Sequence, residues 1–204
     1  MGEDMKKTIV MVYDKAVISG GDAKIAIQSA VELAKNPDNN VIYFAANAEV
    51  DECLQSNDAI KVVCIDTPHI ANNKNKIKAS LYGIWNRQAK TEFTKLLLDL
   101  DPTHTVIHIH GWSKALSVSV VAVAQNMRFP VLITLHDYFA VCPNGGFFNY
   151  QKKELCHLKP MSWKCISCNC DKRSYFQKIW RCVRQTVQNR YVKNVKNIHF
   201  AYIS

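Results

Sequence analysis

The sequence lacks an export signal. Only a short apolar run separates residues 1–7 from Asp14, which is too short for the core of a signal peptide and much too short to span a bilayer. The pattern for N-myristoylation also fails, because position 6 is Lys. In a chain that is not exported, cysteines are more often free thiols or metal ligands than disulfides. We therefore expect a cytoplasmic protein with eight reduced cysteines, of which Cys53 and Cys64 are ordinary small core residues.

Internal repeats and low-complexity tracts are also absent, whereas positive charge is in excess. The 204 residues are 48% hydrophobic, enough for one well-buried globular core, and the formal net charge is +9. Residues 172–196 hold eight Lys and Arg and no carboxylate. This segment is either a solvated helix face, a peripheral contact with the anionic inner face of a membrane, or a site for a phosphorylated substrate. We expect no nucleic-acid partner, because no groove-entering motif or aromatic-interleaved RNA signature accompanies the charge.

Strand-like and helix-like segments alternate along the chain. Apolar, β-branched runs predict strands at residues 8–13, 41–45, 60–65, 105–111, 131–135 and 198–203. Periodic segments predict helices after the glycine turn at 19–22, and at residues 79–100, 113–125 and 175–195. Strands separated by helices throughout favour an α/β fold, with a doubly wound parallel sheet and helices on both faces.

Ligands of an open parallel sheet bind beyond the carboxyl ends of its strands. Right-handed crossovers place five residues of this chain along that rim. These candidate site residues are Gly20, Gly21, His110, His136 and Asp137.

The turn formed by Ser19, Gly20, Gly21 and Asp22 can bring backbone N–H groups close to a diphosphate at the start of the first helix. The turn does not match G-x-G-x-x-G, and no Gly-Lys-Ser/Thr follows it, so nicotinamide and ATP chemistry are not favoured. The alternative is a plain turn in which Asp22 caps the helix.

Histidines mark the ends of two predicted strands. His108 and His110 share one strand face, but no third metal ligand follows at a suitable spacing. We therefore expect His110 at the rim near a substrate, and His108 partly buried and hydrogen-bonded. His136 is a candidate for donating or accepting a proton, with Asp137 fixing its tautomer. The alternative is that Asp137 caps a turn beside a structural histidine.

A cysteine-rich insertion spans residues 138–171. Its C-x-x-C pair has the spacing of a zinc knuckle, and two further cysteines can close a tetrahedral site. The predicted ligands are Cys142, Cys156, Cys165 and Cys168. With four protein ligands the zinc would be structural, since no position is left for water. Cys170 and His157 are spare candidates; an iron–sulfur cluster, whose usual spacings are missing, and unbound thiols are the alternatives.

Three of these segments together resemble a known family. They are the Ser-Gly-Gly turn at 19–21, the Val-Ile-His-Ile-His-Gly segment at 106–111, and Thr-Leu-His-Asp-Tyr at 134–138 followed by Cys142-Pro143 and the spaced cysteines. Over essentially the whole chain the sequence resembles the N-terminal, Rossmann-like half of family 4 glycosyltransferases of the GT-B fold. The segment from His136 to the cysteines is similar to a subset of bacterial members that act in cell-surface polysaccharide assembly.

The resemblance implies transfer of a sugar from a nucleotide-sugar to a saccharide or lipid-linked acceptor. By position, Gly20 and Gly21 would approach the diphosphate of the donor, His136 would lie beside the reacting sugar, and His110 would line the acceptor side. Members of the family hold the nucleotide-sugar mainly with a second domain. Residues 1–204 would then be one acceptor-side domain, with the C-terminal donor-binding domain absent. The alternative is a non-catalytic, zinc-stabilised α/β binding module for a carbohydrate or a protein partner.

Overall fold

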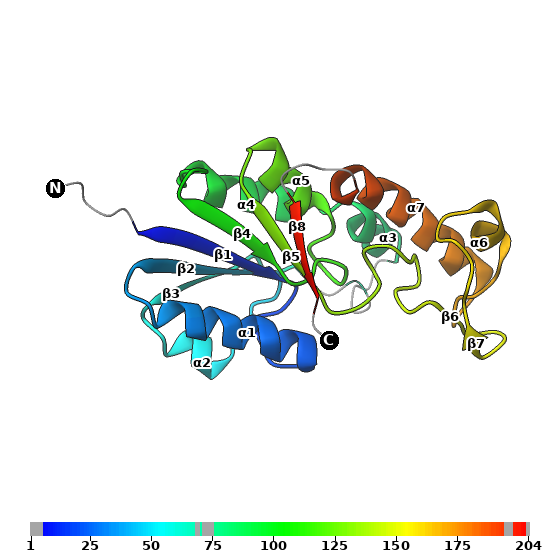
Figure 1. The fold of residues 1–204 in the computed structure, drawn as a ribbon, viewed down its shortest axis with the longest axis horizontal. Coiled ribbons are helices and arrows are strands. Elements are labelled where there is room, and N and C mark those ends of the chain that lie inside the picture. Colours follow the sequence, from blue (N-terminus) through cyan, green and yellow to red (C-terminus); the bar gives the residue numbers. More distant parts are fainter. Residues whose placement is uncertain (1–5, 68–69, 71–75, 194–197, 203–204) are drawn as a thin grey trace.

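The computed structural model describes residues 6–67, 70, 76–193 and 198–202. Its main element is a six-stranded sheet in the order β3-β2-β1-β4-β5-β8, with every neighbouring pair parallel (Figure 1). The strands are β1 Lys7–Tyr13, β2 Asn39–Ala45, β3 Ile60–Cys64, β4 Thr105–Ile109, β5 Val131–Leu135 and β8 Ile198–Tyr202. The chain starts at the centre of the sheet and winds outward to both edges, which confirms the predicted doubly wound, Rossmann-like α/β fold.

Helices cover both faces of this sheet. Helices α1 (Gly21–Ala34) and α2 (Glu52–Gln55) lie on one face, and α4 (Arg87–Leu98) and α5 (Ser119–Asn126) lie on the other (Figure 1). Helix α3 (Lys76–Ile84) packs beside the long helix α7, Tyr175–Val192. The cysteine-rich insertion, with the hairpin β6 (Phe148–Asn149) and β7 (Glu154–Leu155) and helix α6 (Trp163–Ser167), lies at the far end of α7 from the sheet (Figure 1). The sequence did not predict α2.

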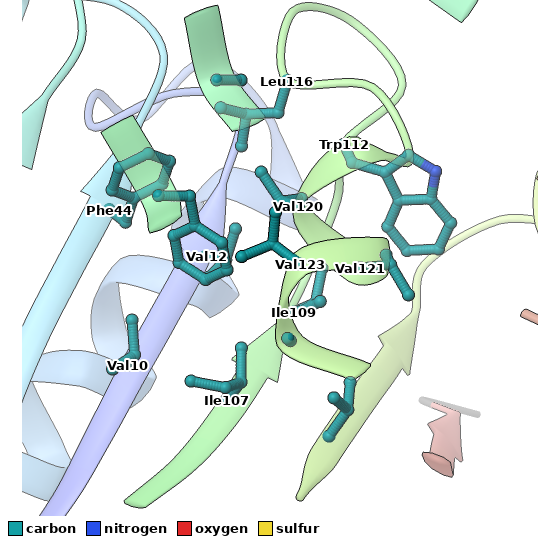
Figure 2. Close-up of a cluster of buried hydrophobic side chains, with 14 of the residues drawn as sticks. Val10, Val12, Phe44, Ile107, Ile109, Trp112, Leu116, Val120, Val121 and Val123 are labelled. Atoms are coloured by element: carbon teal, nitrogen blue, oxygen red, sulfur yellow. The ribbon is translucent and has the colours of Figure 1, made fainter. Parts of the chain in front are cut away.

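The two faces of the sheet bury separate apolar clusters. Because side chains alternate along a strand, Val10 and Val12 of β1 face α4 and α5, whereas Met11 and Tyr13 face α1. Figure 2 shows the first cluster, in which Val120 and Val123 of α5 lie over Val12 of β1 and Ile109 of β4, and Trp112 lies at the edge. Burial on both faces explains why these strands read as continuous apolar runs.

The helix predicted at residues 79–100 is broken in two. Asn86 ends the run between α3 and α4, and its side chain caps α4 by accepting a hydrogen bond from the Ala89 N–H. Asn86 is fully buried, and it also donates its backbone N–H to Ser117 Oγ and its side-chain amide to the Ala115 carbonyl. These contacts to a segment about 30 residues later in the chain override the local helical periodicity.

The helix predicted at residues 113–125 begins only at Ser119. Residues 111–118 instead form a loop, which contains Ser117 in the left-handed region at φ 63°. The buried carboxylate of Asp14, which follows β1, accepts three backbone hydrogen bonds of 2.8 Å from this loop. The donors are Lys114, Ala115 and Leu116. A side chain from another strand therefore fixes the loop and delays the helix.

Candidate functional site

A crevice opens at the carboxyl ends of β1, β4 and β5. It lies where the order of the chain reverses in the sheet, and Tyr13, His110 and His136 line it from the three strand ends. Asp137 also lines it, so the structure brings together three of the predicted rim residues. The enclosed cavity is only about 40 Å³. It can hold a water molecule or two but not a sugar ring, so a larger ligand would lie across its mouth.

Three imidazoles form one contiguous group beneath the crevice. His110 Nδ1 lies 3.0 Å from His136 Nε2, and the ring centroids of His108 and His110 are 4.2 Å apart. His108 Nε2 lies 2.8 Å from Thr134 Oγ1, as expected of a partly buried, hydrogen-bonded histidine. His110 lines the crevice at the strand ends, but only 5% of it is exposed, and its ring contacts His136. Its predicted role on the acceptor side stays a prediction.

Burial makes all three histidines weak bases. It lowers the pKa of His108 to about 4 and the pKa of His110 to about 3, with neighbouring imidazoles adding to the effect. Burial also lowers the pKa of His136, against the opposing charges of Asp22 and Asp137. The group is therefore neutral near pH 7, and it can donate and accept hydrogen bonds without carrying charge.

Asp137 does not orient His136. Its side chain is exposed, and its carboxylate accepts the backbone N–H of Phe139 at 2.8 Å, which caps the turn after β5. Within the described parts of the chain, the hydrogen bond to the His136 ring comes from His110. The alternative interpretation of Asp137 as a turn cap is the one that fits the structure.

An ion pair that the sequence did not predict borders the same crevice. Asp22 Oδ2 accepts a 2.6 Å hydrogen bond from the Tyr13 hydroxyl, and Lys114 Nζ lies 3.2 Å from the same oxygen. Burial opposes ionisation, but the Tyr13 hydrogen bond and the Lys114 charge lower the pKa of Asp22 to about 2. Gly20 is the N-cap of α1, and Asp22 lies inside the first turn, where its Oδ1 accepts the Ala23 N–H at 3.0 Å. Tyr13 is the last residue of β1, and this position at a strand end was the available signal; Lys114 lies in the loop after β4.

The glycine turn lies beside this ion pair and outside the small cavity. A Cβ at Gly20 would lie 3.0 Å from Asp22 Oδ1, whereas a Cβ at Gly21 would meet no atom within 4 Å. A groove of about 840 Å³, lined in part by Lys15 and Ser19, runs along the turn. The packing of the protein therefore leaves open space at Gly21.

The cysteines of the insertion do not form a ready zinc site. Among the residues that the structure describes, no three His, Cys, Asp or Glu side chains converge in a metal-binding arrangement. Cys142 and Cys165 are buried, and Cys156 and Cys168 are half-buried. Zinc therefore has no support from the structure, and the four-cysteine site stays a prediction.

A buried lysine contacts two of the sulfurs instead. Lys178 Nζ lies 3.5 Å from Cys165 Sγ and 3.2 Å from Cys170 Sγ, and Lys178 is fully buried. The side-chain amide of Asn144 donates to Cys170 Sγ at 3.1 Å. Burial raises the pKa of the Cys170 thiol, and the Lys178 hydrogen bond opposes that rise. The net pKa of Cys170 is raised, so the sulfur is a thiol near pH 7, and it accepts hydrogen bonds from both donors.

Cys53 is not a core residue as predicted. It lies exposed on α2, with Sγ 3.0 Å from Asp51 Oδ1, because the unpredicted helix α2 carries it to the surface. Cys64, at the end of β3, is half-buried.

The basic segment is not one solvated face. Lys178 is fully buried, Arg184 is 8% exposed, and Arg181 Nε lies 2.7 Å from the buried carboxylate of Asp171. Lys196 lies outside the described residues. The inward direction of these three cations contradicts a uniformly exposed basic helix. In the described residues, no helix combines the length and apolar character that a membrane crossing requires.

No family model and no curated protein matches the chain. Solved structures do match, at low similarity. The crystal structure of LpCGTa in complex with UDP is 9% identical, with a TM-score of 0.46, over 89% of this chain and 43% of that one. A UDP-glucosyltransferase from Polygonum tinctorium capable of glucosylating indoxyl, in complex with 3,4-dichloroaniline, is 10% identical, with a TM-score of 0.47, over 98% of this chain and 52% of that one. The chain thus spans about half the length of these structures, and its fold is established by its own strand order.

Proposed function

We propose that this chain is the acceptor-side domain of a glycosyltransferase. It would take part in moving a sugar from a nucleotide-sugar to a saccharide or lipid-linked acceptor, in the assembly of cell-surface polysaccharide. The observation that carries the proposal is the neutral His136, which is hydrogen-bonded to His110 in a crevice at the switch point of the sheet.

The hydrogen bond between the two histidines favours one tautomer. His110 Nε2 is buried and has no hydrogen-bond partner among the described residues. A bare nitrogen there avoids burying an unpaired N–H, so the proton of His110 lies on Nδ1 and is donated to His136 Nε2. His136 then carries its own proton on Nδ1. It can donate this N–H to a sugar oxygen at the mouth of the crevice.

Such a donor suits sugar transfer from a diphosphate. Cleavage of the bond to the leaving diphosphate develops charge on the sugar and on the phosphate oxygens, and fixed donors around the sugar stabilise that charge. The Gly20–Gly21 turn, with open space at Gly21, is the proposed approach for the donor diphosphate. The small enclosed volume fits a site that a second, donor-binding domain completes.

Replacement of His136 by Ala tests the proposal. The assay supplies the protein together with a donor-binding domain, a panel of UDP-, GDP- and dTDP-sugars, and saccharide or lipid-linked acceptors. We expect kcat/KM to fall about a hundredfold or more, because a positioned donor is lost, while the melting temperature stays within a few degrees. His104→Gln is the matched control, since His104 is an exposed histidine outside the crevice.

Two outcomes would contradict the proposal. Turnover that is unchanged in His136→Ala, or that falls only in step with the melting temperature, would make His136 a structural histidine. Binding of a saccharide without binding of any nucleotide-sugar or transfer from one would favour the non-catalytic binding module.

A further inference from the structure

Helices α3 and α7 lie side by side (Figure 1). A basic groove lies between them, next to the strand-end crevice. Its volume is about 450 Å³, and Ser113 and Lys114 line both the groove and the crevice. Helix α7 and the residue Arg173 ahead of it supply most of the remaining wall, and Ile70, Ala79 and Ser80 close the other side. A molecule that lies in the groove would therefore reach the mouth of the crevice.

Every ionisable residue in the described lining of the groove is a cation. These residues are Lys114, Arg173, Arg181 and Arg184. Asp171 pairs with Arg181 at 2.7 Å, and Asp22 pairs with Lys114 at 3.2 Å. In the described part of the chain, Arg173 and Arg184 have no carboxylate partner. The groove thus carries positive charge that the fold does not neutralise.

Arg184 is the most unusual of these cations. Only 8% of it is exposed, and its guanidinium carbon lies 4.1 Å from the Phe139 ring centroid and 4.8 Å from that of Trp180. Its Nε is buried and has no hydrogen-bond partner among the described residues. Burial, with the nearby Arg181 charge, lowers the pKa of Arg184 to about 9. The charges of Asp137 and Asp14 oppose this shift only in part, and neither carboxylate forms an ion pair with Arg184. A buried cation that lacks a directly paired carboxylate is costly, so an anion in the groove would be favourable.

We propose that the groove binds the phosphate or diphosphate group of a phosphorylated acceptor, with Arg184 as the central donor and Arg173 and Lys114 beside it. This inference rests on the proposed function, because the acceptor would extend from the groove to His136 in the crevice. The planar fork of arginine donates two parallel hydrogen bonds to a phosphate, and the two aromatic rings hold that fork in place. The groove would be a second anion site, because none of the residues that line it belongs to α1 or its glycine turn.

Titration calorimetry with inorganic pyrophosphate tests the groove on the chain itself. We expect one binding site per chain, with affinity reduced roughly tenfold or more in Arg184→Met and also reduced in Arg173→Gln, since each removes a charge-assisted contact. Arg190→Gln is the matched control, because Arg190 is exposed on the same helix and does not line the groove. If Arg184→Met fails to fold, Arg173→Gln decides, since Arg173 is exposed.

Several results would overturn the inference. These are no binding by the wild type, equal binding in all variants, or an equal loss in Arg190→Gln, which would indicate diffuse surface charge. Loss of pyrophosphate binding in Gly21→Ala alone would move the site to the glycine turn.

A second arm identifies the source of the phosphate. Sedimentation with phosphatidylglycerol vesicles, against phosphatidylcholine vesicles as the neutral control, should show binding that Arg184→Met abolishes if the phosphate belongs to a lipid. Pyrophosphate binding without vesicle binding would assign a soluble phosphate ester.

The experiments also distinguish failure of this inference from failure of the proposed function. Pyrophosphate binding in the groove without sugar transfer contradicts only the glycosyltransferase assignment, and transfer with an unchanged acceptor KM in Arg184→Met contradicts only the groove.

Discussion

His110 and His136 directly follow the neighbouring strands β4 and β5, and a 3.0 Å hydrogen bond joins His110 Nδ1 to His136 Nε2. His110 is buried, whereas His136 is half-buried and lines the crevice. The inner histidine therefore positions the outer one, and both are neutral near pH 7 because burial lowers their pKa values.

This arrangement predicts a loss of stability in mild acid. The folded-state pKa values of His108 (about 4) and His110 (about 3) lie below the ordinary value of 6.5. As the pH falls from 6.5 to 5, the unfolded chain binds protons at these positions and the folded chain does not, so the free energy of unfolding falls. Each histidine contributes at most about 1.4 kcal/mol per pH unit. Urea titrations across this window measure the slope.

The variant His110→Gln should reduce this slope, and His104→Gln, which changes an exposed histidine, should leave it unchanged. The window stops at pH 5 because carboxylates with ordinary pKa values near 4 begin to titrate below it. A slope that is the same in His110→Gln and the wild type would contradict the low pKa of this group.

Asp14→Ala should destabilise the fold strongly. The change leaves the backbone N–H groups of residues 114–116 buried without their acceptor, and each unsatisfied donor costs about 1–3 kcal/mol. We expect the free energy of unfolding to fall by about 3 kcal/mol or more, measured by chemical denaturation. Asp58→Ala, at an exposed aspartate, should change it by less than about 0.5 kcal/mol.

Two glycine substitutions should have opposite effects. A Cβ at Gly83 would lie 2.7 Å from Trp180 Cζ2 and 2.9 Å from Ile70 Cδ1, so α3 and α7 must move apart. Overpacking of this kind costs about 1–3 kcal/mol, partly offset by the higher helix propensity of alanine. Gly21→Ala, at the start of α1 with open space around it, should leave the stability unchanged or raise it slightly. Denaturation of the pair checks the difference, and equal stability would contradict the close packing of α3 on α7.

Gly21→Ala also tests whether the glycine turn binds the nucleotide-sugar donor. If the glycine turn approaches a diphosphate, the added methyl group should weaken binding of the nucleotide-sugar while the melting temperature is retained. Affinity that is unchanged in this variant would leave the turn without a role in binding.

Lys178→Met should destabilise the insertion. The ammonium group of Lys178 is buried against Cys165 and Cys170, and its loss removes the donor from both sulfurs. We expect a fall of about 2 kcal/mol in the free energy of unfolding, whereas Lys172→Met, at an exposed lysine, should have little effect.

Metal analysis of the purified protein tests the zinc prediction. Elemental analysis of protein purified without added metal should find about one zinc per chain if Cys142, Cys156, Cys165 and Cys168 bind it, and Cys165→Ser should remove it. Fully folded protein without metal would leave Lys178 and the thiols as the structural centre of the insertion.

The sequence predicted the parts of the fold that depend on local pattern. Strands β1, β4 and β5 were evident because burial on both faces requires unbroken apolar runs, and the strand-end rule then located His110 and His136. The break at Asn86 was not evident, because its partners Ala115 and Ser117 lie about 30 residues away in the chain.

The orientation of charged side chains was equally hidden. In the sequence, Arg184 and Lys178 have the pattern of an exposed basic helix. Their burial depends on Phe139 and Cys170, which lie in other segments of the chain. The tautomer-fixing role expected of Asp137 fell to His110 for a related reason. The contact between the two imidazoles depends on the register in which β4 and β5 pair, and the sequence alone does not give that register.

The contact between Asp14 and residues 114–116 has a consequence for the order of folding. The two segments are separated by 100 to 102 residues, so closing this loop carries a large entropy cost, and only the completed pairing of β1 with β4 brings them together. The wall that the crevice shares with the basic groove would then form after β1 has paired with β2, whose partners are much closer in the chain. Pulse-labelling hydrogen exchange should find the Lys114, Ala115 and Leu116 amides protected only after those of β1 and β2.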